Sequence, residues 1–128
     1  MLSFSVPTTR HEELLEITPQ IEDVVSQAHI TEGLCHIFVP HTTCGLTINE
    51  NADPTVRQDI LKGLSIIPEH GFAHAEGNSP AHIKSSLLGH SLTIFVKNSR
   101  LALGRWQGIY LAEFDGPRTR KVWVSLRQ

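Results

Sequence analysis

The sequence has little of what marks secreted, disulfide-stabilised or membrane-spanning proteins. Only two of its 128 residues are cysteines, Cys35 and Cys44, which is too few for a disulfide framework. We expect both to be small, partly buried thiols in a reducing compartment. No basic group precedes an apolar run near Met1, and no apolar stretch approaches the length of a membrane span. These absences predict a cytoplasmic protein without a membrane partner.

Charge is also scarce, with 19% charged residues against 40% hydrophobic ones and a net charge of -2. These are the proportions of an ordinary globular protein, and we expect one domain over residues 1–128. The chain is not basic enough to indicate nucleic-acid binding. The large aromatic residues lie in or beside apolar segments, which favours packing in the core or between subunits: Trp106, Tyr110 and Trp123.

The few charges are unevenly distributed along the chain. Residues 1–96 hold four Lys/Arg and eleven Asp/Glu, whereas residues 97–128 hold seven and two. One interpretation is that the two parts neutralise each other across the fold or across a subunit contact. The other is that Arg118, Arg120 and Lys121 form an anion site, because guanidinium groups match the geometry of phosphate.

Three places pair a capping side chain with a proline in the first helical turn: Thr18-Pro19, Asp53-Pro54 and Ser79-Pro80. Gly33 and Gly89 lie just past the expected ends of the first and third helices. Apolar segments bounded by turn residues predict strands near 2–6, 13–17, 34–39, 45–49, 91–96, 101–103, 108–114 and 121–126.

Three short helices among seven or eight strands, without strict alternation, predict an α+β fold with mainly antiparallel sheet. The strands are too many and too short for one flat sheet, so we expect a sandwich or a partly closed barrel. Such a small chain leaves sheet edges exposed, and other subunits could cover them.

Eight histidines are the most unusual feature of the composition. His41 follows a strand end, His74 lies in a glycine-bounded loop, and His82 lies on the third helix beside Ser85, away from the apolar stripe of that helix. Three imidazoles with an open fourth position would make a catalytic type of zinc site. We expect His36 to be a hydrogen-bonded core residue, and we expect three others to face solvent: His11, His29 and His90.

The third helix has a second possible role, because a helix N-terminus attracts anions such as phosphate. Ser79 begins this helix, and Lys84 and Ser85 could assist in binding. The alternative is that Ser79 only caps the helix.

Carboxylates supply a third kind of candidate. Glu50 follows a strand, and Glu113 and Asp115 share a face beside the basic run. Each could ligate a metal, act as a general base or orient a histidine. The plain alternative is an ion pair with Arg118 or Arg120.

Three long segments resemble the signature of the YjbQ-like family: HTTCGLTINENADPTVRQD (41–59), EGNSPAHIKSSLLG (76–89) and GRWQGIYLAEFDGPRTR (104–120). The resemblance implies a compact α+β fold, a homotrimer with its pocket near the subunit contact, and the label secondary thiamine-phosphate synthase. It places three histidines and four polar residues at motif positions: His41, His74, His82, Asn49, Glu50, Gln107 and Glu113. It gives no support to a Cys44 nucleophile.

The sequence therefore leaves two functions open. The first is an enzyme for a small phosphorylated metabolite, with a histidine-lined metal and anion pocket. In its synthase form it would join hydroxymethylpyrimidine diphosphate to thiazole phosphate. The second is a non-catalytic, metal- or ligand-binding trimer. Histidine ligands favour zinc as the divalent metal, whereas the synthase reaction would need magnesium to neutralise diphosphate.

Overall fold

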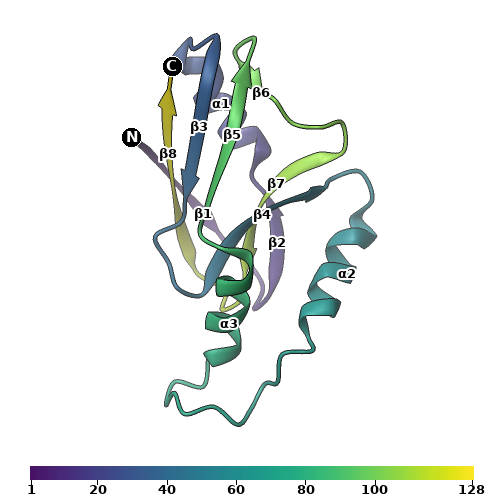
Figure 1. The fold of residues 1–128 in the computed structure, drawn as a ribbon. Coiled ribbons are helices and arrows are strands. Elements are labelled where there is room, and N and C mark those ends of the chain that lie inside the picture. The colour runs from purple at the N-terminus through teal and green to yellow at the C-terminus, as the bar shows by residue number, and fades with distance from the viewer.

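A computed structural model describes residues 1–128 as eight strands and three helices (Figure 1). The strands are β1 Leu2–Pro7, β2 Glu13–Glu16, β3 Glu32–Phe38, β4 Cys44–Glu50, β5 Ser91–Lys97, β6 Arg100–Leu101, β7 Gln107–Glu113 and β8 Thr119–Arg127. The helices are α1 Thr18–Ala28, α2 Pro54–Leu64 and α3 Ser79–Leu88. None of them has the length and apolar character needed to cross a membrane.

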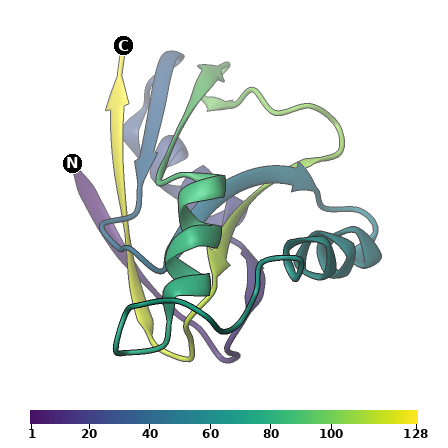
Figure 2. The ribbon, with the colours of Figure 1, turned by 60° about the horizontal axis from the view of Figure 1, so that its bottom comes forward.

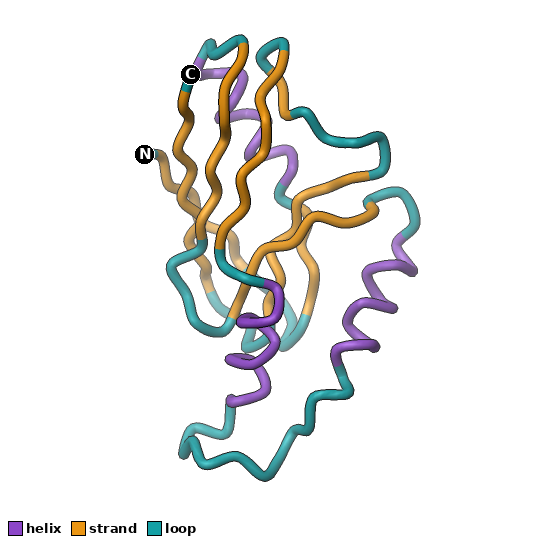
Figure 3. Tube along the Cα trace, viewed as in Figure 1, coloured by secondary structure: helices purple, strands orange, loops and turns teal.

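The strands form two antiparallel sheets that curl into a half-barrel, which confirms the predicted fold class (Figure 3). One sheet has the order β1-β8-β3-β5-β6, and the other has the order β2-β7-β4. The main hydrophobic core lies between the sheets and is covered by Ile21 and Val25 of α1. A smaller apolar cluster around Tyr110 and Phe114 lies on the other face of the three-stranded sheet, against α3 and the partly buried apolar residues of α2.

Helix α2 stands away from the rest of the molecule, and the segment 65–78 leads from it to α3 (Figures 1 and 2). The apolar residues on this helix predict a stripe that faces a core, but α2 has no fully buried residue. Ile66 and Phe72, in the following segment, are also exposed. The arm formed by α2 and residues 65–78 therefore touches the smaller cluster only through partly buried residues of α2 and is otherwise exposed.

The helix ends agree only in part with the capping predictions. The side chain of Asp53 accepts a hydrogen bond from the Thr55 amide, which confirms it as the cap of α2. The prediction for Thr18 is wrong, because its hydroxyl donates to Glu16 and accepts from the Ile109 amide instead. The end of α1 is likewise at left-handed His29 rather than near Gly33.

The packing of α3 does not follow its apolar stripe. Its buried residues include Lys84 and Ser85, whereas Leu87 is 63% exposed. The helix lies close to β4, where a Cβ on Gly45 would come within 2.6 Å of a backbone oxygen. The Ser85 hydroxyl donates to the carbonyl of Thr42. The hydroxyl gives this carbonyl a hydrogen-bond donor, which a leucine side chain cannot do. Ser85 therefore faces inward, while His82 stays partly exposed.

His36 is not in the core, so that prediction is wrong. It alternates with the buried residues Cys35 and Ile37 and therefore lies on the outer face of the five-stranded sheet. The predicted hydrogen bond is present, because its Nδ1 lies 3.0 Å from Oγ1 of Thr93 on β5. Phe38 and Trp123 stack on the same outer face.

Candidate functional site

A buried ion pair between Glu113 and Arg120 joins the two sheets. Glu113 ends β7 and Arg120 lies at the start of β8, and both side chains are almost fully buried. Arg120 donates from Nε to Oε1 of Glu113 at 2.9 Å and from Nη2 to Oε2. This confirms the alternative interpretation of Glu113, an ion pair with one of the two nearby arginines.

Neighbouring polar groups complete this pair. The Thr8 hydroxyl and the Asp115 amide donate to Glu113, while Arg120 donates to the Thr43 hydroxyl. Burial alone would raise the pKa of Glu113, but the hydrogen bonds from Arg120, Thr8 and Asp115 outweigh it and hold the pKa below its ordinary value. Glu113 is therefore an ionised structural group at neutral pH and a poor proton acceptor.

His41 is held beside this pair by a backbone contact. The pairing of β3 with β8 ends at Phe38 and Trp123, and the Lys121 amide beyond that point donates to Nε2 of His41 at 2.8 Å. Burial and the nearby Arg120 charge lower the pKa of His41. The imidazole is thus neutral at pH 7 and carries its proton on Nδ1.

The other two predicted metal ligands lie together. The rings of His74 and His82 have centroids 5.6 Å apart and meet edge to face. His74 also lines a hollow of 140 Å³ that includes His70 and Ser79. The structure therefore brings two predicted metal ligands close to one predicted substrate-binding residue, at the N-terminus of α3.

The spacing of this histidine pair falls within the range of two imidazoles on one metal ion, but no third protein ligand joins them. Two imidazoles that share one zinc ion at about 2.0–2.1 Å have ring centroids roughly 5–6 Å apart. His74 and His82 match that spacing. No group of three His, Cys, Asp or Glu side chains is arranged to hold a metal within one chain, so His41 does not join them.

Two predicted substrate-binding residues on α3 have internal partners. Lys84 is 1% exposed, and its Nζ donates to Glu12 at 2.7 Å and lies 3.8 Å from Glu69. Ser85 is fully buried against Thr42. In the single chain they attach α3 to the loops around it.

The predicted anion site does not form within one chain, because Arg120 is buried and Lys121 points to the opposite face of β8, where its Nζ donates to Ser5. Arg118 forms the other expected ion pair. Its guanidinium donates to the backbone oxygen of Asp115 and lies 3.2 Å from the carboxylate of that residue. The same carboxylate accepts a hydrogen bond from Asn78. Arg118 remains half exposed, in contrast to Arg120.

Asn49, Glu50 and Gln107 lie far from this region. Cys44 pairs with Glu113 at one end of the three-stranded sheet, and Glu50 pairs with Gln107 at the other end. Six residues of strand separate them by about 20 Å. Because of this separation, the two predicted catalytic carboxylates, Glu50 and Glu113, do not meet within one chain. The Glu50 carboxylate instead accepts a hydrogen bond from the Asp53 amide.

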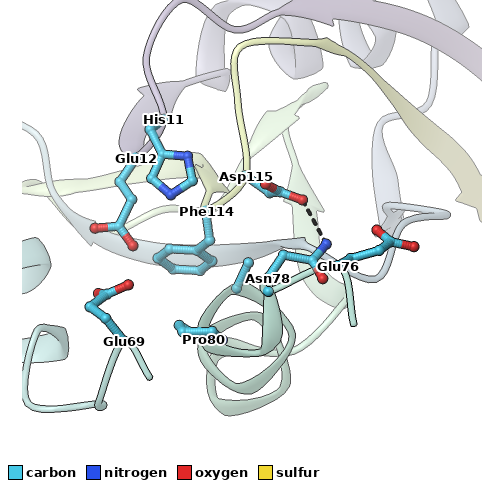
Figure 4. Close-up of a pocket in the computed structure, with 10 residues that line it drawn as sticks. His11, Glu12, Glu69, Glu76, Asn78, Pro80, Phe114 and Asp115 are labelled. Carbon is cyan, nitrogen blue, oxygen red and sulfur yellow. Dashed lines mark hydrogen bonds between the residues drawn. The ribbon is translucent and has the colours of Figure 1, made fainter. Parts of the chain in front are cut away.

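A cavity of 230 Å³ lies beside the start of α3 (Figure 4). We call it the acidic cavity, and its polar and aromatic lining residues are His11, Glu12, Glu69, Glu76, Asn78, Phe114 and Asp115. They come from three separate parts of the chain. No local motif in the sequence indicated that they meet.

Both cysteines are free and buried. Burial raises the pKa of each thiol to about 11. Neither Cys35 nor Cys44 is therefore a thiolate at neutral pH, which agrees with the absence of a nucleophilic role for Cys44.

A family model described as UPF0047 protein YjbQ-like matches residues 2–128. The chain belongs to this family. A UPF0047 protein of Methanocaldococcus jannaschii is 51% identical, with 98% of this chain and 93% of that protein covered. The UPF0047 protein YugU of Bacillus subtilis is 46% identical, with coverage of 97% and 96%.

Solved structures of YjbQ-like proteins share the fold. The crystal structure of an uncharacterised YjbQ/UPF0047 protein from Clostridium acetobutylicum has a TM-score of 0.97 and 46% identity, covering 99% of this chain and all of that one. A conserved hypothetical protein from Thermus thermophilus has a TM-score of 0.92 and 50% identity, with the same coverage. These names state a family and no reaction, so the family confirms the fold and leaves the reaction to be inferred.

Replacing Arg120 with methionine should leave Glu113 buried without its cation. We expect a loss of about 3–5 kcal/mol in the free energy of unfolding, measured by urea denaturation. Arg118→Met is the matched control, because its ion pair is half exposed and should contribute about 1 kcal/mol or less. Equal effects of the two substitutions would contradict the structural role of the buried pair.

The contacts of His41 and Glu113 predict loss of stability in acid. Both pKa values are lowered in the fold, so the unfolded chain takes up protons first, below about pH 6.5 for His41 and below about 4.5 for Glu113. In an NMR titration the His41 ring should titrate below 6.5, and the Lys121 amide resonance should move over the same range. A His41 midpoint at or above 6.5 would rule out this environment.

Proposed function

We propose that this protein is a cytoplasmic enzyme acting on a small phosphorylated metabolite, with a divalent metal ion, most readily zinc, held by His74 and His82. The observation that carries the proposal is the 5.6 Å spacing of these two rings at the start of α3. His70 and Ser79 line one hollow together with His74, so polar groups lie beside this member of the pair. Two protein ligands leave coordination positions for water, substrate or a second subunit.

The family resemblance suggests thiamine-phosphate synthesis as the reaction. In that reaction the thiazole nitrogen forms a bond to the methylene carbon of hydroxymethylpyrimidine diphosphate, the carbon–oxygen bond breaks, and diphosphate leaves with the bonding electrons. A bound divalent ion, zinc or magnesium, would neutralise the leaving diphosphate. Ser79 would donate a hydrogen bond to a phosphate at the start of α3. Half-exposed Arg118, which contacts Asp115 beside Asn78, would add a positive charge.

A non-catalytic ligand-binding protein is the second candidate, and a different observation favours it. Several polar residues expected to do chemistry have internal partners, namely Glu113, Arg120, Lys84 and Ser85. A protein whose buried polar groups hold the fold together can bind a metal or metabolite without turning it over.

Metal content and turnover separate the two candidates. Purified protein should contain close to one metal ion per chain by elemental analysis, and His74→Ala or His82→Ala should weaken metal binding by about tenfold to hundredfold or more. The matched control is His29→Asn, because His29 is exposed at the left-handed end of α1, where asparagine is tolerated.

The same samples should then be given hydroxymethylpyrimidine diphosphate and thiazole phosphate. Equal amounts of thiamine phosphate and diphosphate, lost in the His82→Ala variant, would support the synthase reaction. Metal without turnover would support the non-catalytic candidate. Wild-type protein that folds but neither contains nor takes up metal would exclude the metal site.

We also propose a homotrimer in which one face of each subunit contacts a different face of the next subunit. The outer face of the five-stranded sheet carries apolar and basic side chains: Phe38, Phe95, Trp123, Lys97, Lys121 and Arg127. The arm formed by α2 and residues 65–78 carries exposed Ile66 and Phe72 beside Glu69 and Glu76. Complementary faces of this kind would make a head-to-tail contact, which closes into a three-membered ring if each subunit is rotated by a third of a turn relative to the last.

Light scattering after size-exclusion chromatography should give about three times the chain mass of 14.2 kDa. Phe95→Ser should shift the mass toward the monomer, because Phe95 is 71% exposed in the single chain. Leu87→Ser removes a similarly exposed apolar side chain on α3 and should leave the mass unchanged. A monomeric wild-type protein would exclude the trimer.

A further inference from the structure

We propose that Ser85 is a positioning residue for the histidine pair. Its buried hydroxyl connects the helix turn that carries His82 to a fixed loop, and this contact determines where His82 lies relative to His74. The inference rests on the proposed function for its metal, but it assigns a role to a residue that contacts no ligand. The sequence indicated Ser85 as a substrate-binding residue, and its complete burial excludes that role in the single chain.

The hydroxyl of Ser85 lies between two backbone carbonyls. It donates to the carbonyl of Thr42 at 2.5 Å, and the carbonyl of His82, one helical turn earlier, lies 3.1 Å away. Because Ser85 is fully buried, solvent does not compete for these contacts. The hydroxyl therefore connects the backbone of a predicted metal ligand to a distant segment of the chain.

The loop that accepts this hydrogen bond is held on both sides of Thr42. On one side, the Lys121 amide donates to the ring of His41 at 2.8 Å. On the other side, Arg120 donates to the hydroxyl of Thr43 at 2.7 Å. The carbonyl of Thr42 is thus a fixed point, attached through its neighbours to β8 and to the buried ion pair.

The C-terminal part of α3 packs tightly against β4. A Cβ on Gly45 would come within 2.6 Å of the carbonyl oxygen of Gly89 and within 3.3 Å of that of Ser85. The Gly89 carbonyl also accepts a hydrogen bond from the Leu46 amide at 2.9 Å. Ser85 lies between this tight contact and His82, so it is the point at which the attachment of the helix extends toward the histidine pair.

Ser86 provides a comparison within the same helix turn. Its hydroxyl also donates to the carbonyl of His82, at 2.8 Å, but Ser86 is exposed and its hydroxyl has no hydrogen bond to another segment. Removing the Ser86 hydroxyl changes only the helix itself. Removing the Ser85 hydroxyl also breaks the hydrogen bond between this turn and the loop at Thr42.

The histidine pair requires this accuracy. Two imidazoles share a zinc ion when their ring centroids lie roughly 5–6 Å apart. The rings of His74 and His82 are 5.6 Å apart, and His74 lies on the segment before α3 rather than on the helix. Ligands must be held within about 0.5 Å of their working geometry, so a small shift of the helix turn would separate the pair.

Titration with zinc against a competing chelator tests the role of Ser85. Ser85→Ala should weaken zinc binding by about tenfold or more. Ser85→Thr keeps a hydroxyl and should bind zinc within about threefold of the wild type, although its added buried methyl group lowers stability. Ser86→Ala is the matched control and should change the affinity by less than about twofold.

A second measurement needs no metal. In the metal-free protein the edge-to-face contact between His74 and His82 should give a nuclear Overhauser effect from ring to ring. Ser85→Ala should lose this signal, whereas Ser85→Thr and Ser86→Ala should keep it. Wild-type protein that binds no zinc would reject the proposed function, and the signal between the rings would still decide the role of Ser85.

Three results would overturn the proposal. The first is a Ser85→Ala variant that keeps the zinc affinity and the ring contact of the wild type. The second is a Ser86→Ala variant that loses as much as Ser85→Ala. The third is a zinc affinity that follows the urea stability of the variants rather than the presence of the hydroxyl at position 85, because that pattern belongs to a residue with only a structural role.

Discussion

The buried contact between Glu113 and Arg120 is the constraint around which the polar side of this molecule is organised. Burying two charges is costly unless their geometry is good and their remaining hydrogen-bonding positions are filled. Here Thr8, Thr43 and the Asp115 amide fill them. The turn between β7 and β8 must also stay close, because a Cβ on Gly116 would come within 2.9 Å of Glu113 and Thr8.

This constraint determines which polar groups remain available for ligands. Arg120 faces inward, so Arg118 is the arginine of that turn that reaches the surface. His41 lies at the edge of the buried pair and is neutral because burial and a positive neighbour disfavour its charged form. On the buried side of α3, the side chains of Lys84 and Ser85 connect the helix to the surrounding loops. The helix thereby presents His82 beside His74 at the surface.

Two hollows share the segment that leads into α3. Glu69 and Gly77 line both the acidic cavity and the hollow that contains His70 and His74, so the two lie side by side. One has imidazoles and a helix N-terminus, and the other has carboxylates and an unpaired amide oxygen. The exposed arm brings the same segment to the proposed subunit contact (Figure 2).

The sequence by itself predicted the fold class, the strand segments and the three helix starts, because alternation, helical periodicity and Asp-Pro or Ser-Pro pairs act over a few residues. It also indicated a site of His41, His74 and His82 through the family resemblance, of which the fold brings only His74 and His82 together. It could not predict that α3 buries Lys84, that His36 faces outward or that Glu50 lies about 20 Å from Glu113. The acidic cavity was also hidden in the sequence, because its walls come from segments more than 30 residues apart. Only tertiary structure decides such features, since they depend on which distant backbone or carbonyl each side chain meets.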